Sequence, residues 1–233
     1  NAPTSITSFL SIASKAAGVA FFIKIFFYML GSFHQDFQTL YLIAAVVTMS
    51  FGNLVAIGQK NIKRFMAYSS IAHAGFIFMG LLINSPESKS AIIYFFIAYL
   101  VSNLTIFGVI SFVETETGKT QIKDYAGLSQ KRPLYALAML IALFSLAGIP
   151  PLSGFLGKFY LMNIAAKAGF YWLVGVAAIN STISLYYYLQ IIRQMYVVDG
   201  EENFSGKTPL LFNLVVIALT LGTVLLGIFP IKF

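Results

Sequence analysis

Long apolar stretches set the first limit on what this chain can fold into. Seven of them can be distinguished, at about residues 5–30, 40–58, 65–83, 91–113, 134–166, 170–195 and 210–229. A helix needs about 20 apolar residues to cross a bilayer core, and backbone groups in lipid must pair within their own segment or in a closed barrel. Because the stretches are too long for barrel strands, we expect an all-α integral membrane protein. About seven transmembrane helices would form one transmembrane domain over residues 1–233.

The low content of charged residues leads to the same conclusion. Only 10% of the residues are charged and 58% are hydrophobic, with a mean hydropathy of +0.83. A soluble domain carries about 25% charged residues, so a water-exposed surface cannot be built from this composition. The apolar side chains must therefore face lipid as well as one another. The basic residues are spread over separate short loops, and this spread does not indicate nucleic-acid binding.

The distribution of lysine and arginine predicts how the chain is oriented. Seven spans place the two termini on opposite sides of the membrane. The later loops on the side of the N-terminus hold nine basic residues and the opposite side holds four, namely Lys60, Lys63, Arg64, Lys119, Lys123, Lys131, Arg132, Arg193 and Lys207 against Lys24, Lys89, Lys167 and Lys232. Basic loops stay in the cytoplasm, so the connector at 114–133 is predicted to be cytoplasmic and the C-terminus to lie outside. The same bias explains the net charge of +7 more simply than an anionic partner does.

The chain has no cysteine. This excludes a disulfide framework, thiolate chemistry, an iron–sulfur cluster and cysteine-ligated zinc. The two histidines, His34 and His73, lie far apart in the sequence and are a poor basis for a metal or haem site. We therefore expect no cofactor in this chain. If the protein takes part in redox chemistry, the electron carriers belong to other chains.

Three ionisable residues fall inside the predicted spans, namely Lys15, His73 and Lys158. An ionised lysine at the centre of a bilayer costs about 2.5–3.5 kcal/mol on insertion scales. Lys15 lies about ten residues into its stretch, roughly 15 Å along a helix, whereas Lys24 lies near the end and is expected to reach the interface. A functional role in ion transfer is one interpretation of Lys15. An ion pair with an acid from another chain or a missing segment is the other.

Lys158 follows a stretch that must interrupt its helix. Residues 145–158 contain Gly148, Pro150, Pro151, Gly154 and Gly157 within an otherwise apolar segment. Adjacent prolines remove helix hydrogen bonds and clash with the preceding turn, so the span at 134–166 is expected to break near 148–154. At membrane depth a break is tolerated only where the backbone is buried in protein or lines a polar cavity, and such discontinuous helices form the ion sites of transporters.

A lysine beside such a break can be hydrated when charged and neutral when desolvated, as a proton carrier requires. The alternative for Lys158 is a kinked structural helix whose lysine satisfies the freed carbonyls.

His73 follows Tyr68, Ser69 and Ser70 in the third stretch. Histidine titrates near neutral pH, and neighbouring hydroxyls can hold a chain of water molecules, which favours a place on a proton path. A hydrogen-bonded packing role is an equal alternative. Neutral polar residues in other spans either join helices or supply hydration, and the sequence does not choose among them: Tyr99, Ser102, Asn103, Thr105, Asn180, Ser181, Thr182 and Ser184.

Several strings resemble the antiporter-like subunits of the proton-pumping NADH:quinone oxidoreductase, respiratory complex I. They include Ala67-Tyr-Ser-Ser-Ile-Ala-His73, Asp124-Tyr-Ala-Gly-Leu128, Ser145-Leu-Ala-Gly-Ile-Pro150, Gly154-Phe-Leu-Gly-Lys-Phe159 and Leu185-Tyr-Tyr-Tyr188, with shorter matches at 2–4, 14–17, 51–56 and 61–64. The resemblance runs along nearly the whole chain in the family's order. The strings at 124–128 and 185–188 favour its subunit N (subunit 2) branch.

The resemblance implies the C-terminal half of a fourteen-helix fold, built from two inverted five-helix repeats that each contain a broken helix. Lys15 would match the central lysine that links two half-channels, Lys158 the lysine of the broken helix at the outlet, and His73 a histidine of the tenth helix that is part of the polar axis. Lys63 and Arg64 would match a structural cytoplasmic turn. The first repeat, with its glutamate–lysine pair, has no counterpart here, so we expect this sequence to be part of a longer protein.

By the same resemblance, protons would move through buried lysines and water while quinone is reduced elsewhere in the complex. NADH, FMN, iron–sulfur clusters and quinone would be bound by partner subunits, and the other membrane subunits would be direct partners. A bacterial inner membrane is the expected location. Two rivals stay open: a subunit of a multisubunit cation/proton antiporter or membrane-bound hydrogenase, and a structural membrane scaffold whose lysines only pair with neighbours.

Overall fold

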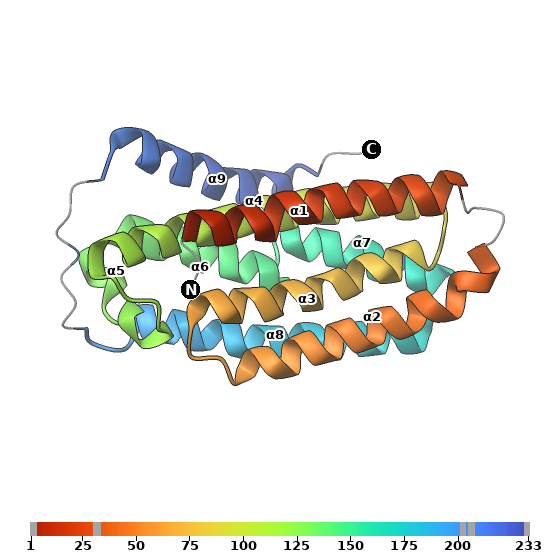
Figure 1. The fold of residues 1–233 in the computed structure, drawn as a ribbon, viewed down its shortest axis with the longest axis horizontal. Helices are drawn as coiled ribbons and strands as arrows, with labels where there is room; N and C mark the ends of the chain where they lie inside the picture. The colour runs from red at the N-terminus through yellow and green to blue at the C-terminus, as the bar shows by residue number, and fades with distance from the viewer. Residues whose placement is uncertain (1–3, 30–33, 201–203, 205–207, 231–233) are drawn as a thin grey trace.

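In the computed structural model, the described residues are 4–29, 34–200, 204 and 208–230, with side chains described from residue 13 onward except at 28, 29 and 34. Over these residues the chain forms a bundle of long helices aligned with its longest axis (Figure 1). The prediction of an all-α protein is confirmed. The elements are α1 Thr4–Ile23, η1 Lys24–Met29, α2 His34–Ile57, α3 Ile62–Leu81, α4 Pro86–Thr117, η3 Ile122–Tyr125, α5 Leu128–Lys131, α6 Pro133–Ala147, α7 Ser153–Lys167, α8 Tyr171–Tyr196 and α9 Leu210–Ile228.

Each predicted apolar stretch lies on one or two of these helices. Among the described residues, three helical segments are long and apolar enough to cross a membrane by length and composition alone: Gln35–Ile57, Pro86–Thr117 and Leu210–Ile228. The stretch at 134–166 is divided between α6 and α7, and neither half reaches that length. α9 lies along the outside of the bundle (Figure 1) and buries little of its surface, as a helix that faces lipid does.

Local capping explains where the helices begin and end. The Asn61 side chain accepts hydrogen bonds from the backbone N–H groups of Lys63 and Arg64 and so starts α3. Ser85 and Ser88 form a reciprocal capping box at the start of α4, and Pro86 occupies the first turn, where its missing N–H is not needed. α4 and α6 both end at a glycine with a positive φ, at Gly118 and Gly148.

The core consists of two apolar clusters at opposite ends of the bundle. The connector-side cluster includes Phe65, Ile106, Ile110, Leu143 and Ile191, and the far-side cluster includes Met49, Phe76, Ile92, Leu161 and Leu173. Polar residues that are buried or partly buried lie on the helices where the two clusters meet, and three of them, Tyr99, Tyr187 and Tyr188, also belong to the connector-side cluster. We call this set the polar layer: Lys15, Asn53, Ser69, Ser70, His73, Tyr99, Ser102, Asn103, Ser145, Ser153, Lys158, Asn180, Ser181, Tyr187 and Tyr188.

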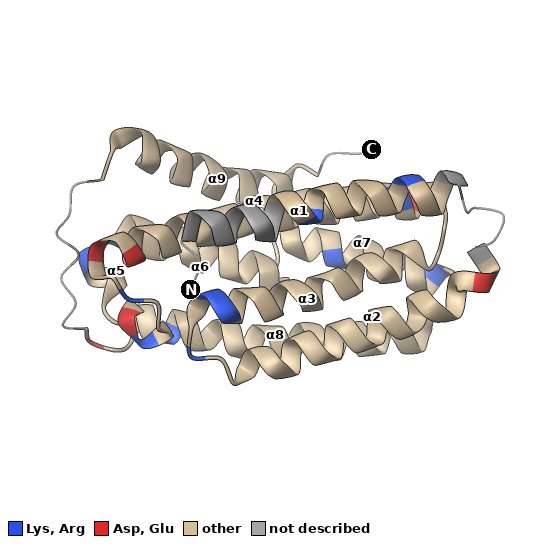
Figure 2. Ribbon diagram, viewed as in Figure 1, with Lys and Arg blue, Asp and Glu red and all other residues tan. Residues whose placement is uncertain are grey.

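Acidic residues are absent from this layer in the described part of the chain. Figure 2 shows acidic positions only towards the two ends of the bundle, whereas basic positions also occur near its middle. On α3, for example, Ser69, Ser70 and His73 separate Phe65 of one cluster from Phe76 of the other. In the part of the chain that the structure describes, the two lysines of the polar layer therefore have no carboxylate in that layer.

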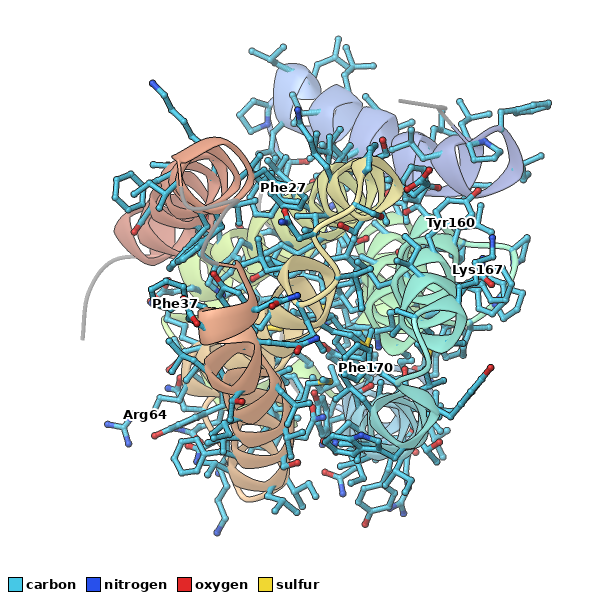
Figure 3. The ribbon with its side chains drawn as sticks, turned by 90° about the vertical axis from the view of Figure 1, so that its right-hand side faces the viewer. Phe27, Phe37, Arg64, Tyr160, Lys167 and Phe170 are labelled. Carbon is cyan, nitrogen blue, oxygen red and sulfur yellow. The ribbon has the colours of Figure 1, made fainter. Side chains whose placement is uncertain are left out.

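The connector folds back onto the start of α3. Asn61 and Gln121 form an isolated antiparallel bridge, and Lys63 and Glu114 form an ion pair of 2.6 Å. Tyr125 is fully buried there, and burial together with the carboxylates of Glu114 and Asp124 raises the pKa of its hydroxyl well above the usual value. Arg64 points away from the bundle (Figure 3). These contacts support the structural interpretation of Lys63.

We expect Glu114→Gln to cost less than about 1 kcal/mol of stability, because the pair is partly solvated and screened by salt. Thermal unfolding of the detergent-extracted protein at low and high ionic strength measures the loss. The difference in stability between wild type and Glu114→Gln should shrink as the salt concentration rises. Adding Lys63→Met to Glu114→Gln should cause little further loss of stability. A large loss that does not depend on salt would contradict a peripheral ion pair.

Candidate functional site

Lys15 lies near the middle of α1 and reaches across to α3 and α4. Its Nζ donates hydrogen bonds to the Ser70 carbonyl oxygen at 2.8 Å and the Tyr99 hydroxyl at 3.3 Å, and lies 5.3 Å from the centre of the Tyr99 ring. Among the described residues, no carboxylate lies within ion-pair distance of this amine. Lys15 is therefore held in the bundle by a carbonyl and an aromatic hydroxyl, both neutral.

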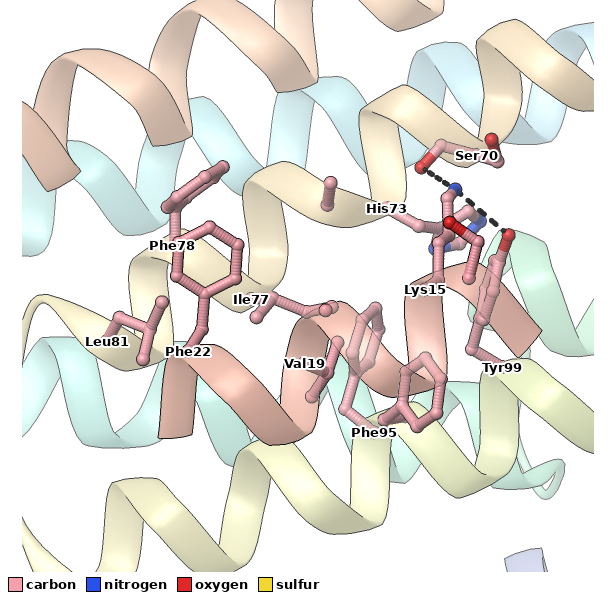
Figure 4. Close-up of a pocket in the computed structure, with 14 residues that line it drawn as sticks. Lys15, Val19, Phe22, Ser70, His73, Ile77, Phe78, Leu81, Phe95 and Tyr99 are labelled. Atoms are coloured by element: carbon pink, nitrogen blue, oxygen red, sulfur yellow. Dashed lines mark hydrogen bonds between the residues drawn. The ribbon is translucent and has the colours of Figure 1, made fainter. Parts of the chain in front are cut away.

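A cavity of about 220 Å³ opens beside Lys15, between α1, α3 and α4. Its two ends differ in chemistry (Figure 4). Lys15, Ser70, His73 and Tyr99 lie at one end, and Phe22, Phe78 and Leu81 line the other. A cavity with apolar walls can be empty or filled with water. Hydrophobic constrictions in channels gate ion conduction by this change in hydration.

His73 is buried between the elements that carry the two lysines. Its Nε2 lies 3.3 Å from the Tyr188 hydroxyl, which is also hydrogen-bonded to the Ser69 hydroxyl. Its ring lies 5.2 Å from the ring of Tyr99, centre to centre, and Nδ1 has no protein partner. Lys15 and His73 line the same cavity, and the Phe76 ring lies 6.4 Å from the His73 ring and 5.0 Å from Lys158 Nζ. His73 thus lies between the surroundings of the two lysines.

The helix is interrupted between α6 and α7, where the glycine and proline residues predict it. α6 ends at Gly148, which adopts a φ of 90°, and α7 begins at Ser153. The Ser145 hydroxyl replaces part of the lost helix bonding, because it accepts from the backbone N–H of Gly154 at 3.0 Å and from the Ser102 hydroxyl at 2.9 Å. The start of α7 is thus buried against α4 and α6, whereas Pro150 and Pro151 within the break are exposed.

Lys158 lies one turn into α7 and turns back towards the end of α6. It is 2% exposed, and its Nζ donates to the Ala147 carbonyl oxygen at 3.1 Å and the Ser181 hydroxyl at 2.9 Å. The Phe76 ring lies 5.0 Å away. The C-terminus of a helix carries partial negative charge and favours a cation. Lys158 thus satisfies a freed carbonyl, as the structural alternative requires, yet no carboxylate among the described residues pairs with it to hold it permanently charged.

The three residues singled out in the sequence share the polar layer but do not bond directly to one another in the described chain. Their hydrogen-bond partners differ: Ser70 and Tyr99 for Lys15, Tyr188 for His73, and Ala147 and Ser181 for Lys158. Hydroxyl groups and the space around them separate the titratable groups. Transfer among them would need bridging water or side-chain motion.

The structure also adds polar residues whose importance the sequence did not reveal. The Asn53 amide donates to Asn180 at 2.9 Å, and the Tyr187 hydroxyl donates to Asn53 at 2.7 Å, which joins α2 to α8. By contrast, Thr105 and Thr182 bond carbonyls of their own helices and contribute nothing visible to the layer. Asn53 lies in the middle of an apolar stretch, and that position was the available signal.

The described residues contain no group of three or more His, Cys, Asp or Glu side chains arranged to hold a metal ion. The polar layer offers lysine, histidine and hydroxyl groups. Such groups bind and release protons and orient water.

The sequence of this chain is similar to those of known membrane proteins. Residues 1–184 match the family described as NADH:quinone oxidoreductase/Mrp antiporter, transmembrane. NADH-quinone oxidoreductase subunit N of Trichlorobacter lovleyi is 43% identical over 98% of this chain and 47% of its own length. This chain thus spans about half the length of the curated relatives that it matches.

Solved structures share the fold. A chain of respiratory complex I from Thermus thermophilus is 31% identical with a TM-score of 0.73, over 82% of this chain and 44% of that one. A chain of the archaeal membrane-bound sulfane sulfur reductase is 26% identical with a TM-score of 0.87, over 98% of this chain and 47% of that one. The helical bundle thus has counterparts in respiratory membrane complexes. This chain is an integral membrane protein that belongs to the NADH:quinone oxidoreductase/Mrp antiporter family, and it resembles the C-terminal half of subunit N.

Proposed function

We propose that this chain moves protons as a membrane subunit of an NADH:quinone oxidoreductase, with Lys15, His73 and Lys158 as the proton carriers. The observation that carries the proposal is the setting of Lys158. A fully buried lysine at a helix break is bonded to a carbonyl and a hydroxyl, without a carboxylate within ion-pair distance among the described residues. Neutral acceptors hold an ammonium group without fixing it in an ion pair, so the same site accepts the neutral amine.

A proton route follows from the order of groups in the polar layer. Lys15 contacts Tyr99, the Tyr99 ring lies against His73, and the Phe76 ring lies beside both His73 and Lys158. Water would bridge the steps that have no direct hydrogen bond. Wetting of the apolar cavity beside Lys15 would open or close that lysine to transfer. Quinone reduction in a partner subunit would supply the free energy by shifting charge along the layer.

We further propose that the chain forms one transmembrane domain over residues 1–233 with seven spans, in which α6 and α7 together make the discontinuous one. The cytoplasm would contact the connector at 114–133, and the C-terminus would lie outside a bacterial plasma membrane, in keeping with the excess of basic residues on the connector side. NADH, FMN, iron–sulfur clusters and quinone would bind partner subunits of the complex.

A second candidate is a subunit of a multisubunit cation/proton antiporter or of a membrane-bound hydrogenase. The matched family includes Mrp antiporters as well as the oxidoreductase, and this observation favours the rival. The subunits that co-purify with the full-length protein show which of the two kinds of complex it belongs to. Relatives named subunit N of NADH-quinone oxidoreductase, at 43% and 40% identity, support the first candidate.

The proton-carrier role of Lys158 is tested by comparing Lys158→Arg with Lys158→Ala in inverted membrane vesicles. Arginine keeps a cation and hydrogen-bond donors but does not release its proton in proteins. We expect both variants to pump few protons per electron, because neither can pass a proton. The readout is the ratio of pumped protons to oxidised NADH in complexes of wild-type composition.

The structural interpretation makes the opposite prediction for arginine. If the cation only satisfied the Ala147 carbonyl, a guanidinium group could take over that role. Lys158→Arg would then pump at the wild-type ratio while Lys158→Ala lost assembly. Near-normal pumping by Lys158→Arg would overturn the proposed role of Lys158.

A further inference from the structure

The last turn of α9 packs directly on the break between α6 and α7. A Cβ atom at Gly227 would overlap the carbonyl oxygen of Pro151. It would also lie 2.6 Å from the carbonyl carbon of Leu152 and 2.7 Å from the backbone nitrogen of Ser153. All three are backbone atoms that no side-chain rotation can move, so only glycine allows this approach. The contact therefore joins the end of α9 to the backbone that begins α7.

The carbonyl group before this glycine cannot be paired within its own helix. In an α-helix the Leu226 carbonyl would accept from the N–H group four residues later, but that residue is Pro230, which has none. The hydroxyl of Tyr94 on α4 donates to the Leu226 carbonyl oxygen instead, at 2.6 Å. An unpaired carbonyl at membrane depth is costly, so this bond stabilises the end of α9 and ties it to α4.

Tyr94 also connects α9 to the helix that carries Lys158. Its side chain is buried, and its ring meets the Tyr160 ring of α7 edge to face, with the centres 5.3 Å apart. At the other end of α9, the Tyr135 hydroxyl bonds the Asn213 side chain. α9 otherwise lies along the outside of the bundle with little of its surface buried (Figure 1). Two tyrosine hydroxyls therefore hold an exposed helix in place, and one of them acts beside the break.

The position of Lys158 depends on where α7 begins. A short segment separates α7 from α6, which ends at Ala147, and Lys158 Nζ reaches back across it to the Ala147 carbonyl oxygen at 3.1 Å. On the side of α6, the Ser145 hydroxyl holds the start of α7 by accepting from the Gly154 N–H. Because Gly227 packs on the residues just before Gly154, a shift of the last turn of α9 would free the start of α7. The lysine amine would then move away from the end of α6.

We propose that the last turn of α9 positions Lys158 for proton transfer. Gly227 lets this turn pack on the backbone at 151–153, and the Tyr94 hydroxyl holds the turn in place. The start of α7 is thereby kept where the lysine amine meets the Ala147 carbonyl. Gly227 and Tyr94 are positioning residues, because they act on the lysine through α7. Their role in pumping rests on the proposed function, whereas the packing of α9 on the break does not.

The packing is tested by hydrogen–deuterium exchange of the segment 145–158, in the full-length protein within its complex. Gly227→Ala places a methyl group where the backbone of the break lies, and the exposed outer side of α9 leaves the helix free to move outward. We expect the amides of this segment to exchange several-fold faster than in wild type, because the break loses its cover. Gly222→Ala is the matched control, since a Cβ there meets Val101 at an ordinary 3.5 Å. Equal exchange in the two variants would overturn the inference.

The positioning role is tested by the ratio of pumped protons to oxidised NADH in the same two variants, in complexes of wild-type composition. We expect the ratio to fall several-fold in Gly227→Ala and to stay unchanged in Gly222→Ala. A contact that only anchored α9 would change the amount of assembled complex and leave the ratio at its wild-type value. Faster exchange with a wild-type ratio would therefore overturn the positioning role.

Tyr94→Phe keeps the inference testable if Gly227→Ala does not assemble. It adds no atom and removes only the hydroxyl that bonds Leu226, and both readouts should change in the same direction as in Gly227→Ala. Combining it with Pro230→Ala separates the tie between helices from simple pairing of the carbonyl, because alanine offers Leu226 the N–H that proline lacks. The double variant should still pump poorly, since α9 is no longer tied to α4. Recovery of the wild-type ratio would overturn the role of Tyr94.

The results also separate this inference from the proposed function. Normal pumping by Lys158→Arg, together with faster exchange in Gly227→Ala, would reject the lysine as a proton carrier and leave the packing of α9 on the break intact. Blocked pumping by Lys158→Arg, together with wild-type exchange and pumping in Gly227→Ala, would reject this inference alone.

Discussion

Replacing Gly154 with alanine is expected to remove most of this subunit from the membrane complex. A Cβ atom at Gly154 would overlap the carbonyl oxygen of Ser145 and lie 2.6 Å from its carbonyl carbon. Both atoms are backbone, so no side-chain rotation relieves the clash. The same close approach holds the Gly154 N–H on the Ser145 hydroxyl across the break. We expect the loss to exceed the roughly 1–3 kcal/mol typical of overpacking, because α6 and α7 must separate.

The amount of subunit in purified complex, with its thermal stability, measures this effect. Gly175→Ala is the matched control, since Gly175 also lies in a helix and a Cβ there would meet no atom within 4 Å. Alanine should be neutral or stabilise by up to about 1 kcal/mol at that position through helix propensity. Equal yields of the two variants would show that the two half-helices do not need to approach as closely as the structure has them.

Lys15→Met is expected to abolish most proton pumping while the complex still assembles. Methionine has a similar length, and it removes a cation whose burial at mid-membrane costs about 2.5–3.5 kcal/mol. What is lost is the amine that bonds the Ser70 carbonyl and the Tyr99 hydroxyl. Pumping in inverted vesicles, measured beside the rate of NADH oxidation, separates loss of transfer from loss of assembly.

Lys24→Met provides the control on the same N-terminal segment. Lys24 is exposed near the end of the segment, so its removal should leave the pumping ratio unchanged. If Lys15→Met pumped normally, the amine would not lie on the proton path. If instead Lys15→Met prevented assembly, Lys15 would serve as a structural cation or as the partner of an acid outside the described chain.

The elements of the fold could be predicted because their signals are local. The length of each apolar stretch predicts a helix, and Pro150 and Pro151 predict where one helix must break. The same reasoning selects Lys158, since a charge beside a break at membrane depth needs an enclosed polar setting. The number of membrane crossings is a separate matter. Only three described segments qualify by length and composition, and the break divides the stretch at 134–166 into two helices that are each too short.

The partners of the site residues could not be predicted, because they depend on packing between distant segments. Lys15 meets Ser70 and Tyr99 across 55 and 84 residues, and Asn53 meets Asn180 across 127. Tyr188 carried no signal beyond its place in a run of three tyrosines, yet it bonds Ser69 and His73. One sequence gives the helix face on which such a residue lies, but not the helix that it faces.

The proton-to-electron ratio of Lys15→Met, Lys158→Met and the double variant, in complexes of equal composition, tests the central claim most directly. If the two lysines serve one path, either single change blocks it. The second change then has no further effect, so the double variant should pump as well as the poorer single variant. Near-normal pumping in either single variant, or losses in the two that add up in the double variant, would contradict a single path through Lys15 and Lys158.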